Sequence, residues 1–167
     1  VALYTSPHLI SLCERLRIND EPVSEEILNR ALLKVKEAAL KENISPTYFE
    51  TLTVAAFLIC KEQGIEVLVA EAGLGGRFDA TAVAKGTLTV LTSIGLEHTA
   101  ILGDTEEKIL LEKLGIMQQE THLVHFPLTE KLSLALNKFK EEKHINSVSV
   151  LDVKLPKLQN LGRHYTE

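Results

Sequence analysis

The sequence predicts an α/β fold, namely a mostly parallel β-sheet with helices on both faces. Two observations lead to this prediction. Short aliphatic segments, typical of buried strands, alternate along the chain with segments whose apolar residues repeat at helical spacing. The 167 residues are 45% hydrophobic and 25% charged, which is enough apolar material for one globular domain with a core. Strands that alternate with helices in this way normally run parallel in one sheet.

The first predicted elements are a strand at 1–4 and two helices. The helix at 24–41 has apolar residues at every third or fourth position behind a serine cap and a preceding proline. The second helix begins at Thr47, whose spacing to Glu50 is that of a capping box, and it ends at Gly64. Its apolar residues run nearly all round the helix, so we expect it to be buried.

The remaining elements continue the alternation of strands and helices. They are, in order, strands at 65–70 and 87–92, a helix opened by Asp104 with Glu107 and closed by Gly115, a strand at 122–126, a helix capped by Thr129 and a strand at 148–151. From residue 154 onward, proline, glycine and amide residues indicate a linker or tail.

Composition argues against several classes of partner and location. The net charge is −5 and no run of Lys or Arg is present, so we expect neither a nucleic-acid partner nor a membrane-surface partner. No apolar run is long enough to span a bilayer and no signal peptide is recognisable, which favours the cytoplasm. Cys13 and Cys60 lack the spacing of a redox or metal motif, and we interpret them as small buried hydrophobes in a reducing compartment.

Polar residues follow three of the predicted strands. These residues are Ser6, Glu71 and His98. Ligands of an open parallel sheet bind beyond the carboxyl ends of its strands, so the three side chains are candidates for one site. A hydroxyl, a carboxylate and an imidazole, with phosphate oxygens, would complete an octahedral shell around Mg²⁺ or Mn²⁺. The structural alternatives are that Ser6 caps a helix, that Glu71 pairs with Arg77 and that His98 binds a loop carbonyl.

The glycine loop at 71–81 brings a carboxylate, three glycines and Arg77 together after a strand. It is not a dinucleotide-binding fingerprint, because Phe78 occupies the position of the required third glycine and no helix opens there. We expect its glycines to permit positive φ angles or close approach to a ligand or a neighbouring helix. By position alone, Lys113 is a solvated cation near a helix end. Among the other histidines, only His8 lies beside a predicted strand end.

Six motifs then occur in a fixed order between residues 3 and 117. They are Tyr-Thr-Ser-Pro-His-Leu at 4–9, Glu-Arg-Leu-Arg-Ile-Asn at 14–19, Phe-Glu with Thr53 at 49–53, the glycine loop at 71–81, Thr-Ser-Ile-Gly-Leu-Glu-His-Thr at 92–99 and Glu-Lys-Leu-Gly-Ile at 112–116. Together they resemble the folylpolyglutamate synthase/dihydrofolate synthase family of the Mur ligase superfamily. The resemblance implies a partial ATP-binding central ligase domain at 1–153, followed by a linker at 154–167 toward a C-terminal domain.

The activity that the resemblance implies is ATP-dependent amide ligation. A carboxylate of dihydropteroate or folate would attack the γ-phosphate of ATP, and the amine of L-glutamate would displace phosphate from the acyl phosphate. The implied cofactors are Mg²⁺ and ATP, and the parent protein is expected to be a monomer. Carried over by motif, the metal ligands are Ser6, Glu71 and His98, the catalytic residues are His98 and a carbamylated Lys113, and the residues near folate or substrate are Arg77, Asp79 and His8.

The sequence also departs from this family. The family's phosphate-binding Gly-Lys loop is expected upstream of Tyr4, and its small C-terminal domain is expected beyond the tail, so we predict a central-domain fragment that is inactive alone. Glu97, Leu114 and Ala82 replace a common Asp, Ala and Asn. Two alternatives stay open: a Mur-type ligase of cell-wall synthesis, and a non-catalytic homologue that binds folate or a partner.

Overall fold

The computed structural model describes residues 1–117 and 121–149. The chain forms two compact units. Unit 1 contains 1–85 and 112–117, and unit 2 contains 86–111 and the described residues 121–149. The linker predicted at 154–167 lies outside the described residues.

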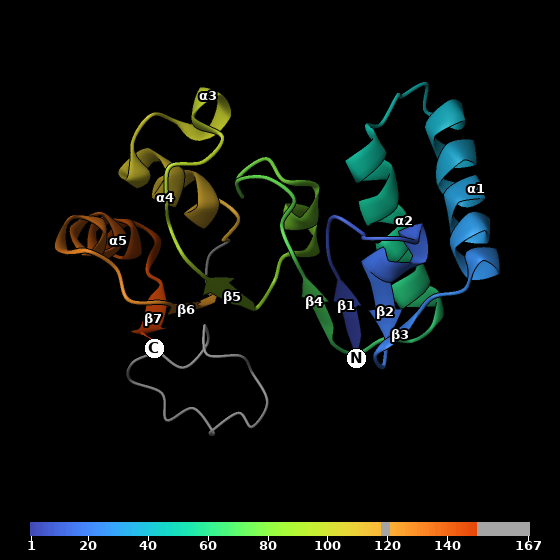
Figure 1. The fold of residues 1–167 in the computed structure, drawn as a ribbon, viewed down its shortest axis with the longest axis horizontal. Helices are drawn as coiled ribbons and strands as arrows, with labels where there is room; N and C mark the ends of the chain where they lie inside the picture. The colour runs from blue at the N-terminus through green and yellow to red at the C-terminus, as the bar shows by residue number, and fades with distance from the viewer. Residues whose placement is uncertain (118–120, 150–167) are drawn as a thin grey trace. The chain divides into compact units, whose positions relative to one another are not determined.

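Unit 1 is built on a four-stranded sheet with the order β3-β2-β1-β4 (Figure 1). Its strands are β1 (Ala2–Tyr4), β2 (Leu16–Ile18), β3 (Glu21–Pro22) and β4 (Leu68–Ala70). β4 runs parallel to β1, as predicted. β2 runs antiparallel to β1, and β3 runs antiparallel to β2. Asn19 and Asp20 both have positive φ angles, 49° and 70°, which suit the tight turn of a β2–β3 hairpin. The α/β class is therefore confirmed, but this sheet is mixed because of a hairpin that the sequence analysis did not include.

Two long helices of unit 1 match their predictions closely. Helix α1 (Glu25–Lys41) begins where the Ser24 hydroxyl accepts a hydrogen bond from the backbone of Ile27. Helix α2 (Tyr48–Glu62) opens with the predicted capping box, in which the Glu50 carboxylate accepts from the Thr47 backbone at 2.7 Å. The unit also contains two short 3₁₀ helices, η1 (Leu12–Arg15) and η2 (Ala80–Ala84).

The core of unit 1 lies between its sheet and its two helices. Ala2 and Tyr4 on one face of β1 are buried in the same cluster as Ile59 of α2. Leu3 and Val69 project from the opposite face, where they are 37% and 55% exposed.

A buried hydrogen-bond chain fixes β1 against the start of α2. The Thr53 hydroxyl donates to the Phe49 carbonyl at 2.8 Å, so its oxygen accepts from the Tyr4 hydroxyl at 3.0 Å. Burial raises the pKa of Tyr4, which keeps this hydroxyl protonated. The Tyr4 and Phe49 rings lie 6.1 Å apart, centroid to centroid. The end of β1 and the first turn of α2 therefore form one rigid corner.

The two cysteines have the expected environment. Cys13 and Cys60 are free thiols, and both are buried in unit 1. Burial raises the pKa of the Cys60 thiol, so its reactive thiolate form is disfavoured. Their interpretation as small hydrophobes is confirmed.

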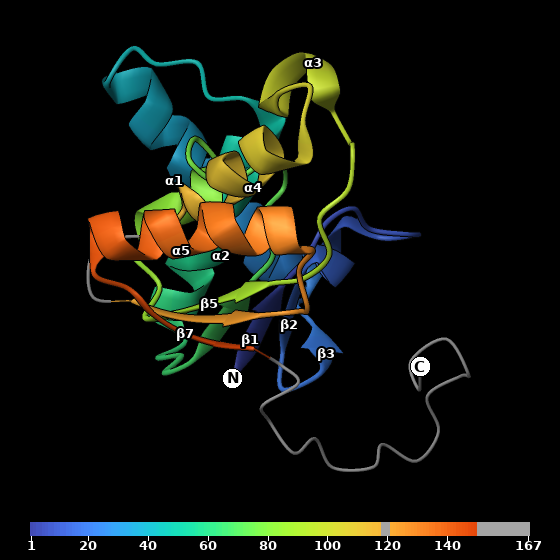
Figure 2. The same cartoon turned by 90° about the vertical axis from the view of Figure 1, so that its left-hand side faces the viewer.

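Unit 2 contains a three-stranded parallel sheet with the order β5-β6-β7. Its strands are β5 (Leu88–Leu91), β6 (His122–His125) and β7 (Asn146–Ser149). Helices α3 (Thr99–Leu102) and α4 (Glu106–Leu114) lie between β5 and β6 in sequence, and α5 (Glu130–Lys143) lies between β6 and β7. The last residues of α4, from Glu112, belong to unit 1. Helix α5 runs along this sheet (Figure 2) and buries Leu132, Leu136 and Phe139. The last strand begins two residues earlier than predicted, and residues 150–151 lie outside the described part of the chain.

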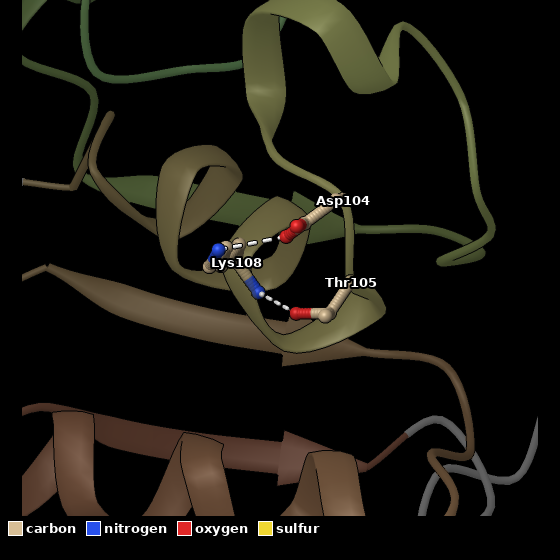
Figure 3. A network of polar contacts seen from close by, with 3 residues as sticks. All are labelled: Asp104, Thr105 and Lys108. Carbon is tan, nitrogen blue, oxygen red and sulfur yellow. Dashed lines mark hydrogen bonds and ion pairs between the residues drawn. The ribbon is translucent and has the colours of Figure 1, made fainter.

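The start of α4 differs by one residue from the prediction. The Thr105 hydroxyl accepts a hydrogen bond from the backbone of Lys108, so Thr105 caps the helix (Figure 3). Asp104, the predicted cap, instead forms an ion pair of 2.7 Å with the Lys108 side chain. Both side chains of this pair are largely exposed, so it contributes little to stability. No helix in the described ranges is long and apolar enough to span a membrane.

Candidate active site

Ser6 and Glu71 lie side by side beyond two neighbouring parallel strands. The pairing of β1 with β4 continues past both strands, because the Glu71 backbone donates to the Tyr4 carbonyl at 2.9 Å. The Ser6 backbone then donates to Glu71 Oε2 at 2.8 Å. Glu71 is exposed, so its carboxylate is accessible to a ligand. The structure thus brings together two of the three predicted metal ligands, at the sheet edge where the parallel topology predicts them.

The Asp79 carboxylate links two parts of the glycine loop by hydrogen bonds. One carboxylate oxygen accepts from the backbones of Gly73 and Leu74 at 2.8 and 2.9 Å. The other accepts from the backbone of Thr81 at 2.9 Å and from its hydroxyl at 2.5 Å. Asp79 is only 8% exposed. With four internal hydrogen bonds and little exposure, this carboxylate shapes the loop and has little capacity left for a ligand.

Two glycines let the loop lie directly against the end of α4. A Cβ on Gly76 would lie 2.2 Å from the Lys113 carbonyl oxygen, and a Cβ on Gly115 would lie 2.6 Å from the Cβ of Arg77. Such distances exclude any side chain at either position unless the backbone moves. The predicted close approach of the loop to a neighbouring helix is therefore confirmed, and it places the half-buried Lys113 beside the loop that follows Glu71.

Arg77 pairs with Glu112 instead of with Glu71. Its backbone donates to the Glu112 carbonyl at 3.0 Å, and its Nε lies 3.2 Å from Glu112 Oε2. The structural alternative for Glu71, an ion pair with Arg77, is thus not what the structure shows. A guanidinium that already has a carboxylate partner is a weaker candidate for binding an anionic substrate.

The segment after Ser6 is held by Glu14, which sequence reasoning missed. The Glu14 carboxylate accepts from three successive backbone groups, those of Leu9, Ile10 and Ser11, at 2.9, 3.1 and 2.7 Å. Ser11 and Glu14 form a capping box at the start of η1. Their Ser-x-x-Glu spacing was a signal that could have identified this role. The alternative that Ser6 caps a helix is wrong, because Ser11 is the cap.

His8 lies in the segment that Glu14 holds. Its Nδ1 accepts a hydrogen bond of 3.0 Å from Nε of Arg15. The Arg15 guanidinium carbon lies 5.5 Å from the centroid of the Tyr48 ring, which is a cation–π geometry. His8 and Arg15 are both half-buried. Arg15 was not among the predicted site residues.

Glu14 gives a pH-dependent prediction. Its hydrogen bonds to the backbones of Leu9 and then Ser11 lower its pKa in the folded chain, so the ionised form stabilises the fold above the unfolded value near 4.5. That stabilisation is lost as the pH falls through the depressed folded pKa. We therefore expect Glu14→Gln to lower the urea midpoint at neutral pH, by an amount that shrinks as the pH falls below 4.5. Glu37→Gln, an exposed change on α1, is the charge-matched control, and an equal loss in both variants at neutral pH would contradict the role of Glu14.

His98 occupies an unusual backbone conformation in unit 2. It is the N-cap residue of α3 with φ 45° and ψ 39°, and its carbonyl accepts from Ile101 and Leu102. Its imidazole makes no capping bond, and the residue is exposed. A positive φ is uncommon for a residue other than glycine, although histidine adopts it more readily than most, and His144 at the end of α5 does so too.

The donor set is consistent with a metal whose shell is completed by ligand oxygens. No cluster of three or more His, Cys, Asp or Glu side chains occurs in residues 1–117 and 121–149. The Ser6–Glu71 pair offers a hydroxyl and a carboxylate, which are hard oxygen donors typical of Mg²⁺ sites shared with phosphates. Zinc, which is usually bound by several His or Cys residues, fits this donor set poorly.

Comparison with known proteins identifies folylpolyglutamate and dihydrofolate synthases among the similar sequences. Dihydrofolate synthase/folylpolyglutamate synthase of Bacillus subtilis is 38% identical over 149 residues, which are 86% of this chain and 34% of that protein. The protein of the same name from Escherichia coli is 38% identical over 120 residues, covering 72% of this chain and 28% of its own length. Folylpolyglutamate synthase of Arabidopsis thaliana is 36% identical and covers 96% of this chain and 29% of that protein. The chain therefore spans about a third or less of these curated relatives.

Solved structures agree with the sequence relatives. A structure described as an FPGS–AMPPCP complex has a TM-score of 0.84 at 27% identity, and it covers 89% of this chain and 38% of its own. Escherichia coli FolC in complex with DHPP and ADP has a TM-score of 0.81 at 33% identity, covering 89% of this chain and 35% of its own. No known family profile matches the chain. The resemblance first seen in the six motifs is confirmed.

Proposed function

We propose that this chain, which is related to folylpolyglutamate synthase/dihydrofolate synthase, is part of an ATP-dependent ligase that joins L-glutamate to dihydropteroate or folate. The observation that carries the proposal is the hydrogen bond that holds Ser6 beside Glu71 at the ends of β1 and β4. The names of the solved relatives, which include AMPPCP, ADP, folate and DHPP complexes, support a nucleotide and a pterin-type acid as ligands. The relatives reported above are folate ligases, which argues against the cell-wall alternative.

In this proposal, Ser6 and Glu71 bind Mg²⁺ together with phosphate oxygens, and His98 keeps the ligand role that the motif resemblance implies. Bound Mg²⁺ would neutralise negative charge on the phosphates of ATP during phosphoryl transfer. Asp79 and Gly76 keep the loop in the shape that presents Glu71. A rigid loop matters because transition-state stabilisation requires ligands that are already in place.

Lys113 and Arg77 have different proposed roles at the end of α4. The backbone of Lys113 contacts Gly76 of the glycine loop. Carbamylation, in which the neutral Lys113 amine would add to CO₂ and lose a proton, would convert this side chain into a carboxylate-like group. Arg77 is paired with Glu112, so we assign it to positioning the loop and not to direct binding of substrate. The free, buried cysteines fit a reducing compartment, and we place the protein in the cytoplasm.

The test measures ADP formation by the complete protein, which depends on both L-glutamate and a pterin carboxylic acid if the proposal is right. Glu71→Gln keeps the shape of the side chain but removes its charge, and we expect kcat to fall about 100-fold or more. The matched control is Glu66→Gln, an exposed change five positions earlier, which should leave kcat unchanged.

Two results would count against the proposal in different ways. Equal turnover by the Glu71→Gln and Glu66→Gln variants would show that Glu71 is not a metal ligand. ADP formation that does not respond to either acceptor would rule out the ligase itself. Mn²⁺ binding to the chain, measured by electron paramagnetic resonance, provides a readout that is independent of turnover and should weaken in Glu71→Gln.

A further inference from the structure

Arg15 is a half-buried cation that is not neutralised by a carboxylate. Within residues 1–117 and 121–149, no Asp or Glu forms an ion pair with it. Its neighbour Glu14 is turned away, since both oxygens of that carboxylate accept from the backbone of the 9–11 segment. Arg77, the arginine that the sequence highlighted, does have a carboxylate partner. The free positive charge near the end of β1 therefore belongs to Arg15.

The position of the Arg15 guanidinium is well defined. The side chain helps to line a small cavity with Leu16 and Leu52, so part of it packs among apolar residues. The guanidinium faces the ring of Tyr48, and its Nε is bonded to His8. A guanidinium has five N–H groups, and one of them is used by His8, so the planar group retains donors in a fixed orientation.

The bond from Arg15 determines which nitrogen of His8 carries a proton. An arginine Nε can only donate, so the Nδ1 of His8 must be the acceptor and carries no hydrogen. The proton of the neutral ring then resides on Nε2. With Nδ1 occupied and Nε2 protonated, His8 has no nitrogen lone pair for a metal or for general-base catalysis. What remains is a single N–H donor.

Both residues belong to the sheet edge that carries the proposed metal ligands. The Arg15 carbonyl accepts from the backbone of Thr5 at 2.9 Å, directly after β1. Ser6 follows Thr5, and His8 lies two positions further along the chain. A cation and a neutral N–H donor are thus held by one short segment next to the Ser6–Glu71 pair.

We propose that Arg15 and His8 form an oxyanion-binding subsite. The guanidinium donors and the Nε2–H group recognise a carboxylate or phosphoryl oxygen of the bound substrate, in charge-assisted hydrogen bonds that a point charge such as lysine reproduces poorly. The subsite rests on the proposed function for the identity of that substrate, because L-glutamate, the pterin acid and ATP all contain such groups. Its existence rests only on the geometry of Arg15 and His8.

The test is a titration of the ¹⁵N-labelled chain with sodium phosphate and, separately, with L-glutamate at constant ionic strength. Signals of the Arg15 Nε–H group and the His8 ring report binding. We expect Arg15→Gln to raise the Kd of the recognised anion about tenfold or more. Arg17→Gln is the matched control, because it makes the same charge change two residues away, where Nε of Arg17 donates to the Asp20 carbonyl. Arg15→Lys keeps the positive charge but removes the planar set of N–H donors, so it should also weaken binding.

Each outcome bears on the proposal. Binding of phosphate but not L-glutamate supports a phosphoryl subsite, and the reverse supports a carboxylate subsite. The proposal would be overturned if neither anion showed saturable binding. It would also be overturned if Arg17→Gln weakened binding as much as Arg15→Gln, because the anion would then be attracted by general positive charge and not by this subsite. Ring ¹⁵N shifts that place the His8 proton on Nδ1 would also overturn it. Mn²⁺ binding should persist in Arg15→Gln, so failure of this subsite is distinguishable from failure of the Ser6–Glu71 metal site.

Discussion

Replacing Asp79 by alanine is expected to lower the free energy of unfolding by about 3 to 5 kcal/mol. The change removes a buried carboxylate that accepts four hydrogen bonds, and it leaves the donors of Gly73, Leu74 and Thr81 without that acceptor. The Thr81 donors are buried, so water cannot readily replace the acceptor that they lose, and an unsatisfied buried donor costs more than its hydrogen bond contributes. Urea unfolding of the purified chain measures the effect directly.

Two further variants separate the carboxylate from the shape of its side chain. Asp79→Asn keeps the volume, but its amide group must face either the Gly73 and Leu74 donors or the Thr81 donors, so we expect a loss of about 2 kcal/mol. Thr81→Val removes only the hydroxyl bond and should cost about 1 kcal/mol. If Asp79→Ala were no more destabilising than Thr81→Val, the carboxylate would not be the group that closes the loop.

Local signals were sufficient for the helices that carry their own caps. Helices α1 and α2 begin where Ser24 and Thr47 predict, because a capping side chain and the apolar period act within a few residues. The start of α4 shows the limit of such signals. Asp104 and Thr105 are adjacent good caps, and the ion pair between Asp104 and Lys108 leaves the capping position to Thr105.

The mixed sheet of unit 1 was harder to predict. β2 and β3 are short, and β3 contains Pro22, which weakens the appearance of a strand. The Asn19-Asp20 pair was the available signal for a hairpin, since both residues tolerate positive φ angles. By contrast, the parallel pairing of β1 with β4 followed from the alternation of strands and helices, and with it the proximity of Ser6 and Glu71.

Pairs between distant charges could not be predicted from the sequence. Arg77 is six residues from Glu71 and thirty-five from Glu112, yet it pairs with the more distant carboxylate. The reason is that Gly76 packs against the backbone of Lys113 and Gly115 packs against Arg77, which brings the end of α4 against the glycine loop. Arg15 was missed for a similar reason, because its role depends on how η1 turns its side chain toward His8.

Gly76 should also be sensitive to substitution, through packing instead of hydrogen bonding. In Gly76→Ala, the new Cβ would lie 2.2 Å from the carbonyl oxygen of Lys113 and 2.9 Å from its Cα. Both contacts are with backbone atoms, so no side-chain rotation relieves them, and either the loop or the end of α4 must move. We expect a loss of about 1 to 3 kcal/mol in the free energy of unfolding, measured by urea denaturation.

The matched control for this change is Gly95→Ala, because a Cβ at Gly95 meets nothing within 4 Å and its φ angle is not positive. That variant should remain within about 0.5 kcal/mol of the parent chain. The displacement in Gly76→Ala should also disturb the Arg77–Glu112 pair, which shares the same contact. A double-mutant cycle with Glu112→Gln therefore measures the coupling, and strictly additive losses would contradict a single rigid contact between the glycine loop and α4.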